Sequence, residues 1–206
     1  MKLFAINRHK LGIDGQGITT LIGLAHCPLK CEYCINKKEI YNLPIKEVTS
    51  QKLWELVMID YCYFIATQGG VTFGGAEPLL QAKEIAEFID MKPKGVQVNI
   101  ETSLNVPQGL LDIIADKVDE FIIDIKDINS EIYKKYTQLD NIQVLNNLEY
   151  LVHKGFQSKC RIRVPLIPNY NTVLDVNKSV EYLGNLGFSN IDKFNYVIRE
   201  VAFDTI

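Results

Sequence analysis

The sequence predicts an α/β fold of parallel βαβ units, and three observations support this class. Short runs rich in Val, Ile and Phe alternate about six times with segments of helical periodicity. Several of these runs are apolar on both faces, which is typical of parallel strands buried between helices. No internal repeat or Pro/Ser-rich linker divides the 206 residues, 47% of which are hydrophobic, so we expect one domain, 1–206. The same alternation suits an open doubly wound sheet or a partial barrel.

The predicted strands are the short apolar runs of the sequence. We expect strands at 19–25, 70–75, 96–101, 120–125, 159–164 and 194–198. In parallel sheets of both kinds, ligands bind beyond the carboxyl ends of the strands. Five of the predicted strands end in polar or metal-binding residue types, which indicates one large site at one rim of the sheet. Those positions are Cys27, Gly74 to Glu77, Glu101 to Ser103, Asp124 with Lys126, and Arg163.

Helical patterns fill the intervals between the strands. The first helix, 50–66, begins at Ser50, a residue type favoured at N-caps, and ends before Gly69-Gly70. The last helix carries four apolar residues at a spacing that makes a single stripe. They are Val173, Val176, Val180 and Leu183. The remaining helices are expected at 79–90, 108–117 and 143–153. Right-handed crossovers would then connect the parallel strands.

Charge and composition exclude several classes of function. The formal net charge is −3 and no basic cluster stands out, which argues against a nucleic-acid-binding surface. No apolar run approaches the ~20 residues that cross a bilayer, and the N-terminus is too polar for a secretory signal. We expect a cytoplasmic protein without membrane or nucleic-acid partners. Cys62 and Cys160 stand alone, and we expect both to be buried as small apolar side chains.

The stretch HCPLKCEYC places Cys27, Cys31 and Cys34 within eight residues. Thiolates bind zinc or iron–sulfur clusters. A structural zinc site needs a fourth ligand, and His26 is adjacent to Cys27, where an extended chain turns the two side chains apart. Complete cysteine ligation of a 4Fe–4S cluster takes four thiolates, so three would leave one iron open to an external ligand. We favour such a cluster, with structural zinc and no metal as the alternatives.

The CxxxCxxC spacing, with Tyr33 before the third cysteine, resembles the signature of the radical S-adenosylmethionine (SAM) enzymes. Four further stretches resemble motifs of glycyl-radical-enzyme activating enzymes, the family that includes pyruvate formate-lyase activating enzymes. They are IDGQGITT (13–20), VTFGGAEPLLQ (71–81), FIIDIKDIN (121–129) and IRVPLIPNYN (162–171). The matches are collinear and cover most of the chain. The resemblance implies a partial (β/α)6 barrel of parallel strands, the radical SAM core, which agrees with the alternation of strands and helices.

The resemblance also implies roles for matched positions. Cys27, Cys31 and Cys34 would bind one 4Fe–4S cluster, and SAM would occupy the open iron. The residues implied to contact SAM are Tyr33, Asn36, Gly74, Gly75, Ala76, Glu77, Thr102, Asp124, Lys126 and Arg163. Glu101 and Asp124 match a site for a small cation near the methionine carboxylate. Asp14 matches a position that faces a peptide substrate.

Simpler structural roles compete with some of these assignments. Glu77 also suits an acid placed at a helix N-terminus, and Gly74-Gly75 suits a tight turn after a strand. Asp124 with Lys126 also suits a surface ion pair. Tyr33 and Asn36 suit residues that only support the cysteine loop. A structural role is as well founded for Arg163 as a role in binding the cofactor.

By resemblance, the protein is a radical SAM oxidoreductase that works without oxygen. A reduced cluster would cleave SAM to methionine and a 5′-deoxyadenosyl radical, which would abstract hydrogen from a glycine of a partner glycyl radical enzyme. A flavodoxin- or ferredoxin-type protein would donate the electron. One alternative is a radical SAM enzyme that acts on another peptide or a small metabolite. A second is a metal-binding scaffold without turnover, suggested by two departures from the family: Ala76 replaces a glycine, and the chain ends at Ile206.

Overall fold

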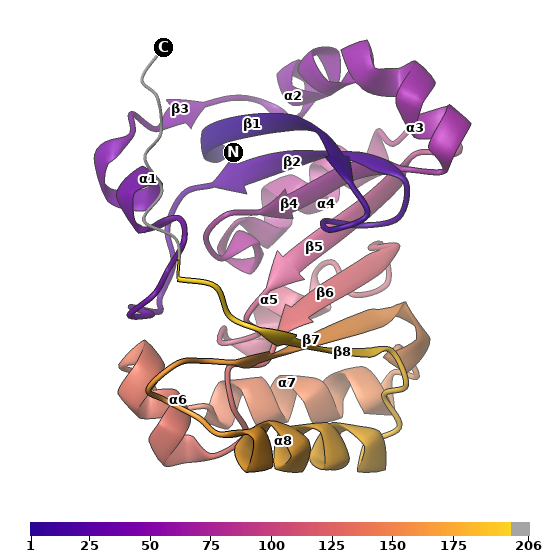
Figure 1. Cartoon of the computed structure of the whole chain (residues 1–206). Coiled ribbons are helices and arrows are strands. Elements are labelled where there is room, and N and C mark those ends of the chain that lie inside the picture. Colours follow the sequence, from indigo (N-terminus) through magenta and orange to yellow (C-terminus); the bar gives the residue numbers. More distant parts are fainter. Residues whose placement is uncertain (199–206) are drawn as a thin grey trace.

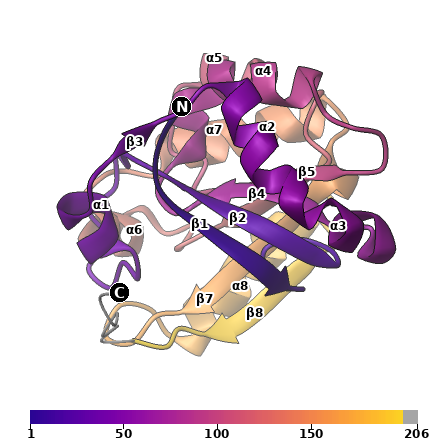
Figure 2. The same ribbon diagram turned by 90° about the horizontal axis from the view of Figure 1, so that it is seen from above.

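The computed structural model describes residues 1–198, and it confirms the predicted α/β class. One sheet of eight strands runs in the order β3-β1-β2-β4-β5-β6-β7-β8. Six of them form a continuous parallel series: β2 (Ile18–Leu24), β4 (Gly70–Gly74), β5 (Gln97–Thr102), β6 (Glu120–Asp124), β7 (Cys160–Leu166) and β8 (Ile191–Asn195). The edge strands β3 and β8 do not pair with each other, so the curved sheet is a partial barrel (Figures 1 and 2).

Helices pack along the outer face of this curved sheet (Figure 2). The α-helices are α1 (Lys37–Asn42), α2 (Ser50–Val57), α3 (Tyr61–Thr67), α4 (Ala82–Asp90), α5 (Gln108–Asp112), α6 (Ser130–Thr137), α7 (Ile142–His153) and α8 (Val173–Asn185). Three short 3₁₀ helices complete the elements: η1 (Met58–Asp60), η2 (Pro78–Gln81) and η3 (Gln157–Lys159). No helix in the described part of the chain is long and apolar enough to cross a membrane.

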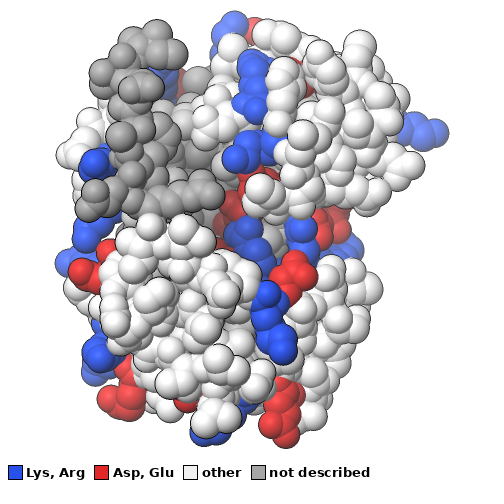
Figure 3. Space-filling model, in the orientation of Figure 1, with Lys and Arg blue, Asp and Glu red and all other residues white. Residues whose placement is uncertain are grey.

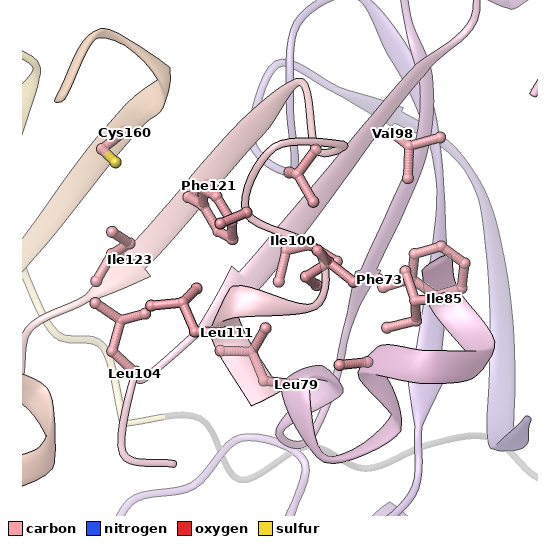
Figure 4. Packing of buried hydrophobic residues seen from close by; sticks show 14 of the residues in the cluster. Phe73, Leu79, Ile85, Val98, Ile100, Leu104, Leu111, Phe121, Ile123 and Cys160 are labelled. Carbon is pink, nitrogen blue, oxygen red and sulfur yellow. The ribbon is translucent and has the colours of Figure 1, made fainter. Parts of the chain in front are cut away.

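The main core lies between the strands and the outer helices. Figure 4 shows strand residues Phe73, Ile100 and Ile123 beside the helix residues Leu79 and Leu111. Because side chains alternate between the two faces of a strand, the residues between these apolar positions face the inside of the barrel. On the inner face they are largely polar, among them Asn99, Glu101, Asp124 and Arg163. These strands are therefore apolar on one face and polar on the other, which differs from the two-sided apolar strands that the sequence suggested.

Several elements differ from the prediction. Strand β1 (Lys2–Leu11), which pairs antiparallel with β2, and the two-residue strand β3 (Lys46–Glu47) were not predicted, nor were α1 and α6. Strand β8 begins three residues before the predicted strand at 194–198, because it pairs with β7 from Ile162↔Ile191 onward. The helix predicted at 50–66 is divided by η1, and its N-cap is Thr49, whose side chain accepts from the backbone N–H of Lys52.

The two isolated cysteines differ in burial. Cys160 is buried on β7, as predicted, and contributes to the core (Figure 4). Cys62 is exposed, so its predicted burial is wrong. It lies on α3, whose buried face is provided by Phe64. The helical pattern at 50–66 was too apolar overall to show which side of α3 faces solvent.

Candidate active site

The three clustered cysteines lie on the loop that connects β2 to α1. All three are free and half-buried, and they line one cavity of about 240 Å³. The loop is held against the end of α6, because the backbone N–H of Lys30 donates to the Thr137 carbonyl at 3.0 Å. A tight turn follows, in which the Cys34 N–H donates to the Cys31 carbonyl at 3.3 Å. The loop therefore directs three thiols toward one volume at the rim of the barrel.

This donor set fits an iron–sulfur cluster. Burial raises the pKa of Cys27 to about 12 and the pKa of Cys31 to about 11, so the thiols need a strongly positive partner to ionise. Each thiolate of a cluster binds its own iron, so the sulfurs need to border one cavity and not to meet at a point. Cys27, Cys31 and Cys34 border one such cavity, so their arrangement fits a cluster.

The glycine segment after β4 lies beside the cysteine loop. The Asn36 side-chain amide donates to the Gly75 carbonyl at 2.7 Å and joins the two segments. Gly75 has a positive φ of 86°, and a Cβ added there would lie 2.8 Å from Gly23 Cα and from Phe4. Ala76 is not among the residues with positive φ, so its methyl group is accommodated without backbone strain. Gly75 therefore allows this segment to approach Gly23 and Phe4 closely, and Ala76 does not disturb that approach.

Glu77 is completely buried and joins three parts of the site. Its Oε1 accepts from the Thr102 hydroxyl at 2.7 Å and from the Leu79 N–H at 3.2 Å. Its Oε2 accepts from the Ser103 hydroxyl at 2.7 Å and from the Ser103 N–H at 3.0 Å. Burial raises the pKa of Glu77, and these hydrogen bonds oppose that rise. Its own N–H donates to the carbonyl of His26, whose side chain is exposed. Glu77 thus caps η2, as its alternative structural role at a helix N-terminus predicted. It also holds the end of β5 through its hydrogen bonds.

A cluster of charged side chains occupies the inner face next to this segment. Arg163 Nε donates to Asp124 Oδ1 at 2.7 Å, and Arg163 Nη2 lies 2.8 Å from Glu101 Oε1. Lys126 Nζ lies 3.4 Å from Asp124 Oδ2, with 15% of the Lys126 side chain exposed. The pair is therefore an interior one, and a surface ion pair is excluded. Figure 3 shows Lys, Arg, Asp and Glu side chains gathered in the groove between the β1–β2 and β7–β8 sides of the molecule.

The titration of these groups follows from burial and mutual contact. Burial favours neutral Asp124, but Lys126 and Arg163 outweigh it and hold the pKa of Asp124 below its ordinary value. Burial raises the pKa of Glu101; Arg163 opposes this rise, whereas the carboxylates of Asp14 and Asp124 add to it. The cluster is thus electrostatically coupled from the β1–β2 loop to β7.

Asp14 lies on the loop between β1 and β2, at the same interior. It is 5% exposed, and its backbone carbonyl accepts from the Thr72 hydroxyl. Its Oδ2 lies 3.7 Å from Lys10 Nζ, too far for a hydrogen bond, and has no hydrogen-bond partner among the described residues. Arg161 holds the loop from across the barrel by donating to the Gly12 and Ile13 carbonyls at 3.4 and 3.3 Å. A buried carboxylate oxygen is therefore held in place with an unused acceptor.

Tyr33 belongs to a group of aromatic side chains on the other side of the cysteine loop. Its ring centroid lies 6.2 Å from that of Tyr136 and 5.7 Å from that of Tyr170. Its hydroxyl accepts from the Asn169 amide at 3.2 Å, and its backbone carbonyl accepts from the Tyr196 hydroxyl. These contacts show that Tyr33 supports the loop.

Sequence reasoning assigned no role to several residues of this site. Ser103 was placed at the predicted rim by its position at a strand end, but its contact with Glu77 was not predicted. Tyr136 and Tyr170 carried none, because they come from α6 and from the loop after β7. The structure brings Glu101 and Asp124 together around Arg163 and places Asp14 near Glu101, whereas Tyr33 faces the aromatic group.

The fold and the site together define an α/β partial-barrel protein with a cysteine-lined cofactor site at its rim. A family model described as the Radical SAM superfamily matches residues 21–179, so the chain belongs to that superfamily. Membership in this superfamily implies SAM and an iron–sulfur cluster as cofactors. It also supports the prediction that the protein is an enzyme.

Curated relatives of this chain include activating enzymes. The (2S)-3-sulfopropanediol dehydratase activating enzyme of Klebsiella oxytoca is 32% identical over 89% of this chain and 77% of the relative. Pyruvate formate-lyase 1-activating enzyme of Escherichia coli K12 is 28% identical over 88% of this chain and 74% of the relative. Among solved structures, SuiB of Streptococcus suis has a TM-score of 0.67 at 12% identity over 87% of this chain. This chain spans 40% of SuiB, and that likeness concerns the fold alone.

Proposed function

We propose that the protein activates a glycyl radical enzyme by abstracting hydrogen from a glycine Cα of that partner. The observation that carries this proposal is the similarity to activating enzymes, 28–32% identity over 88–89% of the chain. The site geometry supports the chemistry, because three half-buried thiols border one cavity beside the Gly75 and Glu77 segment. The electron donor would be a small flavodoxin- or ferredoxin-type protein.

The cofactors would be one 4Fe–4S cluster, held by Cys27, Cys31 and Cys34, and SAM. When both are bound, one-electron reduction supplies carbon–sulfur cleavage to methionine and a 5′-deoxyadenosyl radical, which takes the glycine hydrogen and leaves a glycyl radical. The chain's own task is to position these groups and to exclude water.

Each residue would contribute to this positioning according to where it lies in the site. Gly75 allows the close backbone approach at the rim, and Glu77 fixes the segment that would face the SAM ammonium group. Lys126 lies close enough to Cys31 to lower the pKa of that thiol against the effect of burial, so it would sit between the cluster and the inner charged face. Asp14 would accept a hydrogen bond from the backbone of the peptide substrate, because its Oδ2 accepts no hydrogen bond from the described residues and its charged neighbour, Lys10 Nζ, is 3.7 Å away.

The test starts with the protein reconstituted with iron and sulfide without oxygen, then reduced with dithionite and mixed with SAM. Pyruvate formate-lyase and sulfopropanediol dehydratase are added separately as partners, since relatives of this chain activate enzymes of these names. We expect 5′-deoxyadenosine and, in one partner, the doublet of a glycyl radical in electron paramagnetic resonance.

Other outcomes separate the alternatives. If 5′-deoxyadenosine forms but neither partner nor any glycyl radical enzyme of the same organism acquires the doublet, the activase assignment fails and another peptide or metabolite is the substrate. If a cluster assembles and no SAM is cleaved even with partner present, the scaffold alternative is correct. If iron does not bind and zinc does, the proposed cofactor is wrong.

A further inference from the structure

We infer that the Arg163 guanidinium is the resident cation of the inner face, so the protein binds SAM without a small metal cation beside it. The resemblance implied a metal cation between Glu101 and Asp124. In this structure that position is taken by a side chain of the protein itself. The inference rests on the proposed SAM site, and it changes how the charge of that site is balanced.

The contacts of Arg163 use the carboxylate oxygens that such a cation would need. Arg163 donates through Nε to Asp124 Oδ1 at 2.7 Å and through Nη2 to Asp124 Oδ2 at 3.2 Å. The same Nη2 lies 2.8 Å from Glu101 Oε1, and Lys126 Nζ lies 3.4 Å from Asp124 Oδ2. Three of the four oxygens therefore face protein cations. A hard metal cation binds carboxylate oxygens directly, and here those oxygens already face the guanidinium and the ammonium group.

The fourth oxygen, Glu101 Oε2, is held against the backbone of β4. A Cβ added at Gly74 would lie 2.7 Å from it, so the carboxylate fills the space that the glycine leaves open. Both carboxylates are therefore engaged by groups of the protein itself, and they fit an organic cation better than a metal ion.

The length of the Glu101 side chain explains how one guanidinium reaches both carboxylates. Asp124 and Arg163 are direct partners in the register of β6 and β7. Glu101 is on β5, two strands away from β7, which is about 10 Å at the usual strand spacing. An aspartate at 101 would be one methylene shorter, whereas glutamate and arginine together span the gap. The longer acid and the arginine therefore act as a matched pair.

The interior is also balanced without an additional ion. Each carboxylate of the charged cluster has a cation of the protein beside it: Glu101 and Asp124 contact Arg163, Asp124 also lies near Lys126, and Asp14 lies near the partly exposed Lys10. The neighbouring Glu120 has its own partner, because Arg161 Nε lies 3.3 Å from its Oε1. A metal cation added here would create an excess of positive charge in a buried environment.

The test measures SAM affinity of the reconstituted protein by calorimetry in sodium, potassium or choline chloride at one ionic strength, and in choline chloride with added magnesium. We expect the dissociation constant of the wild type to change less than twofold among these salts. The variant Arg163→Met leaves two buried carboxylates with Lys126 alone. We expect SAM to bind it more weakly in choline and at least tenfold more tightly when a metal cation is supplied.

Arg161→Met is the matched control. It lies two residues away on the same face of β7 and pairs with Glu120, so its SAM affinity should not depend on the metal cation. Tenfold dependence of the wild type on any of the metal ions overturns the inference, whether or not the variant folds. An Arg163→Met protein that binds SAM in choline as tightly as the wild type also overturns it. A wild-type protein that binds no SAM in any salt overturns the proposed function as well as this inference. That outcome differs from a wild type that binds SAM only with a metal cation, which overturns this inference alone.

Discussion

Glu77 and Thr102 are joined by a 2.7 Å hydrogen bond between the ends of the neighbouring parallel strands β4 and β5. This contact explains why two motifs far apart in the sequence form one rim. It also gives Glu77 a structural task beside any contact with SAM, because its carboxylate is the common acceptor for donors from three residues.

We expect Glu77→Ala to lower the free energy of unfolding by about 2–4 kcal/mol, because it leaves buried donors without an acceptor. Glu77→Gln keeps one acceptor oxygen and should lose less. Urea denaturation measures both. Glu55→Ala is the control, since it removes only an exposed contact with Lys52 and should change stability by less than about 0.5 kcal/mol. A Glu77→Ala protein as stable as this control would mean that the hydrogen bonds of Glu77 contribute nothing to the fold.

Gly75 and Ala76 offer a paired test of the rim segment. Gly75→Ala should destabilise by about 2–4 kcal/mol, since its Cβ would combine positive φ with contacts of 2.8 Å to Gly23 and Phe4. Ala76→Gly should cost only about 0.4–1 kcal/mol through the entropy of the unfolded chain. Thermal unfolding compares the two. We also expect Ala76→Gly to leave SAM affinity within twofold. A large gain in affinity would show that the alanine impairs the site.

Replacing Cys27, Cys31 or Cys34 singly with Ala should remove bound iron and abolish SAM cleavage, because two thiolates hold a cluster poorly. Iron content and 5′-deoxyadenosine yield after anaerobic reconstitution measure the two effects. Cys62→Ala is the matched control, because Cys62 is exposed on α3 and lines no part of the cysteine cavity. Full iron content and turnover in any of the three single variants would contradict the ligand assignment.

The central strands were the most predictable part of the fold. Strands β4, β5 and β6 lie within one residue of their predicted limits, because each is a compact run of β-branched and aromatic residues. Strand β1 escaped because KLFAINRHKL has four consecutive apolar residues followed by four polar ones, without the alternation typical of a half-buried strand, and its register is irregular near His9. Helix α6 had a usable signal in the Asn129 N-cap, whose side chain accepts from the N–H groups of Glu131 and Ile132.

The position of the candidate site was predictable, but its contacts were not. The carboxyl ends of parallel strands meet at one rim, so strand order alone gathers Cys27, Glu77 and Asp124. The contact of Arg163 with Glu101 depends on the register of three strands and on two side-chain conformations, which no local pattern records. The aromatic contacts of Tyr33 likewise come from segments more than a hundred residues away along the chain.

Asp14 allows the substrate-binding step to be tested apart from SAM cleavage. Its carboxylate oxygen Oδ2 accepts no hydrogen bond from the described residues, so Asp14→Asn breaks no hydrogen bond at that atom and removes only the 3.7 Å ion pair with the partly exposed Lys10. We expect this variant to cleave SAM in the absence of partner within about twofold of the wild type. The yield of glycyl radical on the partner should fall at least tenfold, because the peptide loses a charged acceptor, whose hydrogen bonds are worth about 1.5–3 kcal/mol.

Asp116→Asn is the control for the same chemical change, since Asp116 is exposed and, among the described residues, its side chain makes no hydrogen bond; its backbone carbonyl accepts from Lys159. Spin counting of the glycyl radical at several partner concentrations separates weaker docking from slower abstraction. A deficit that disappears at high partner concentration places Asp14 in docking. An unchanged yield at every concentration would remove Asp14 from the substrate site. Equal losses of radical yield and partner-free SAM cleavage would instead assign it to the charged interior around Glu101 and Arg163.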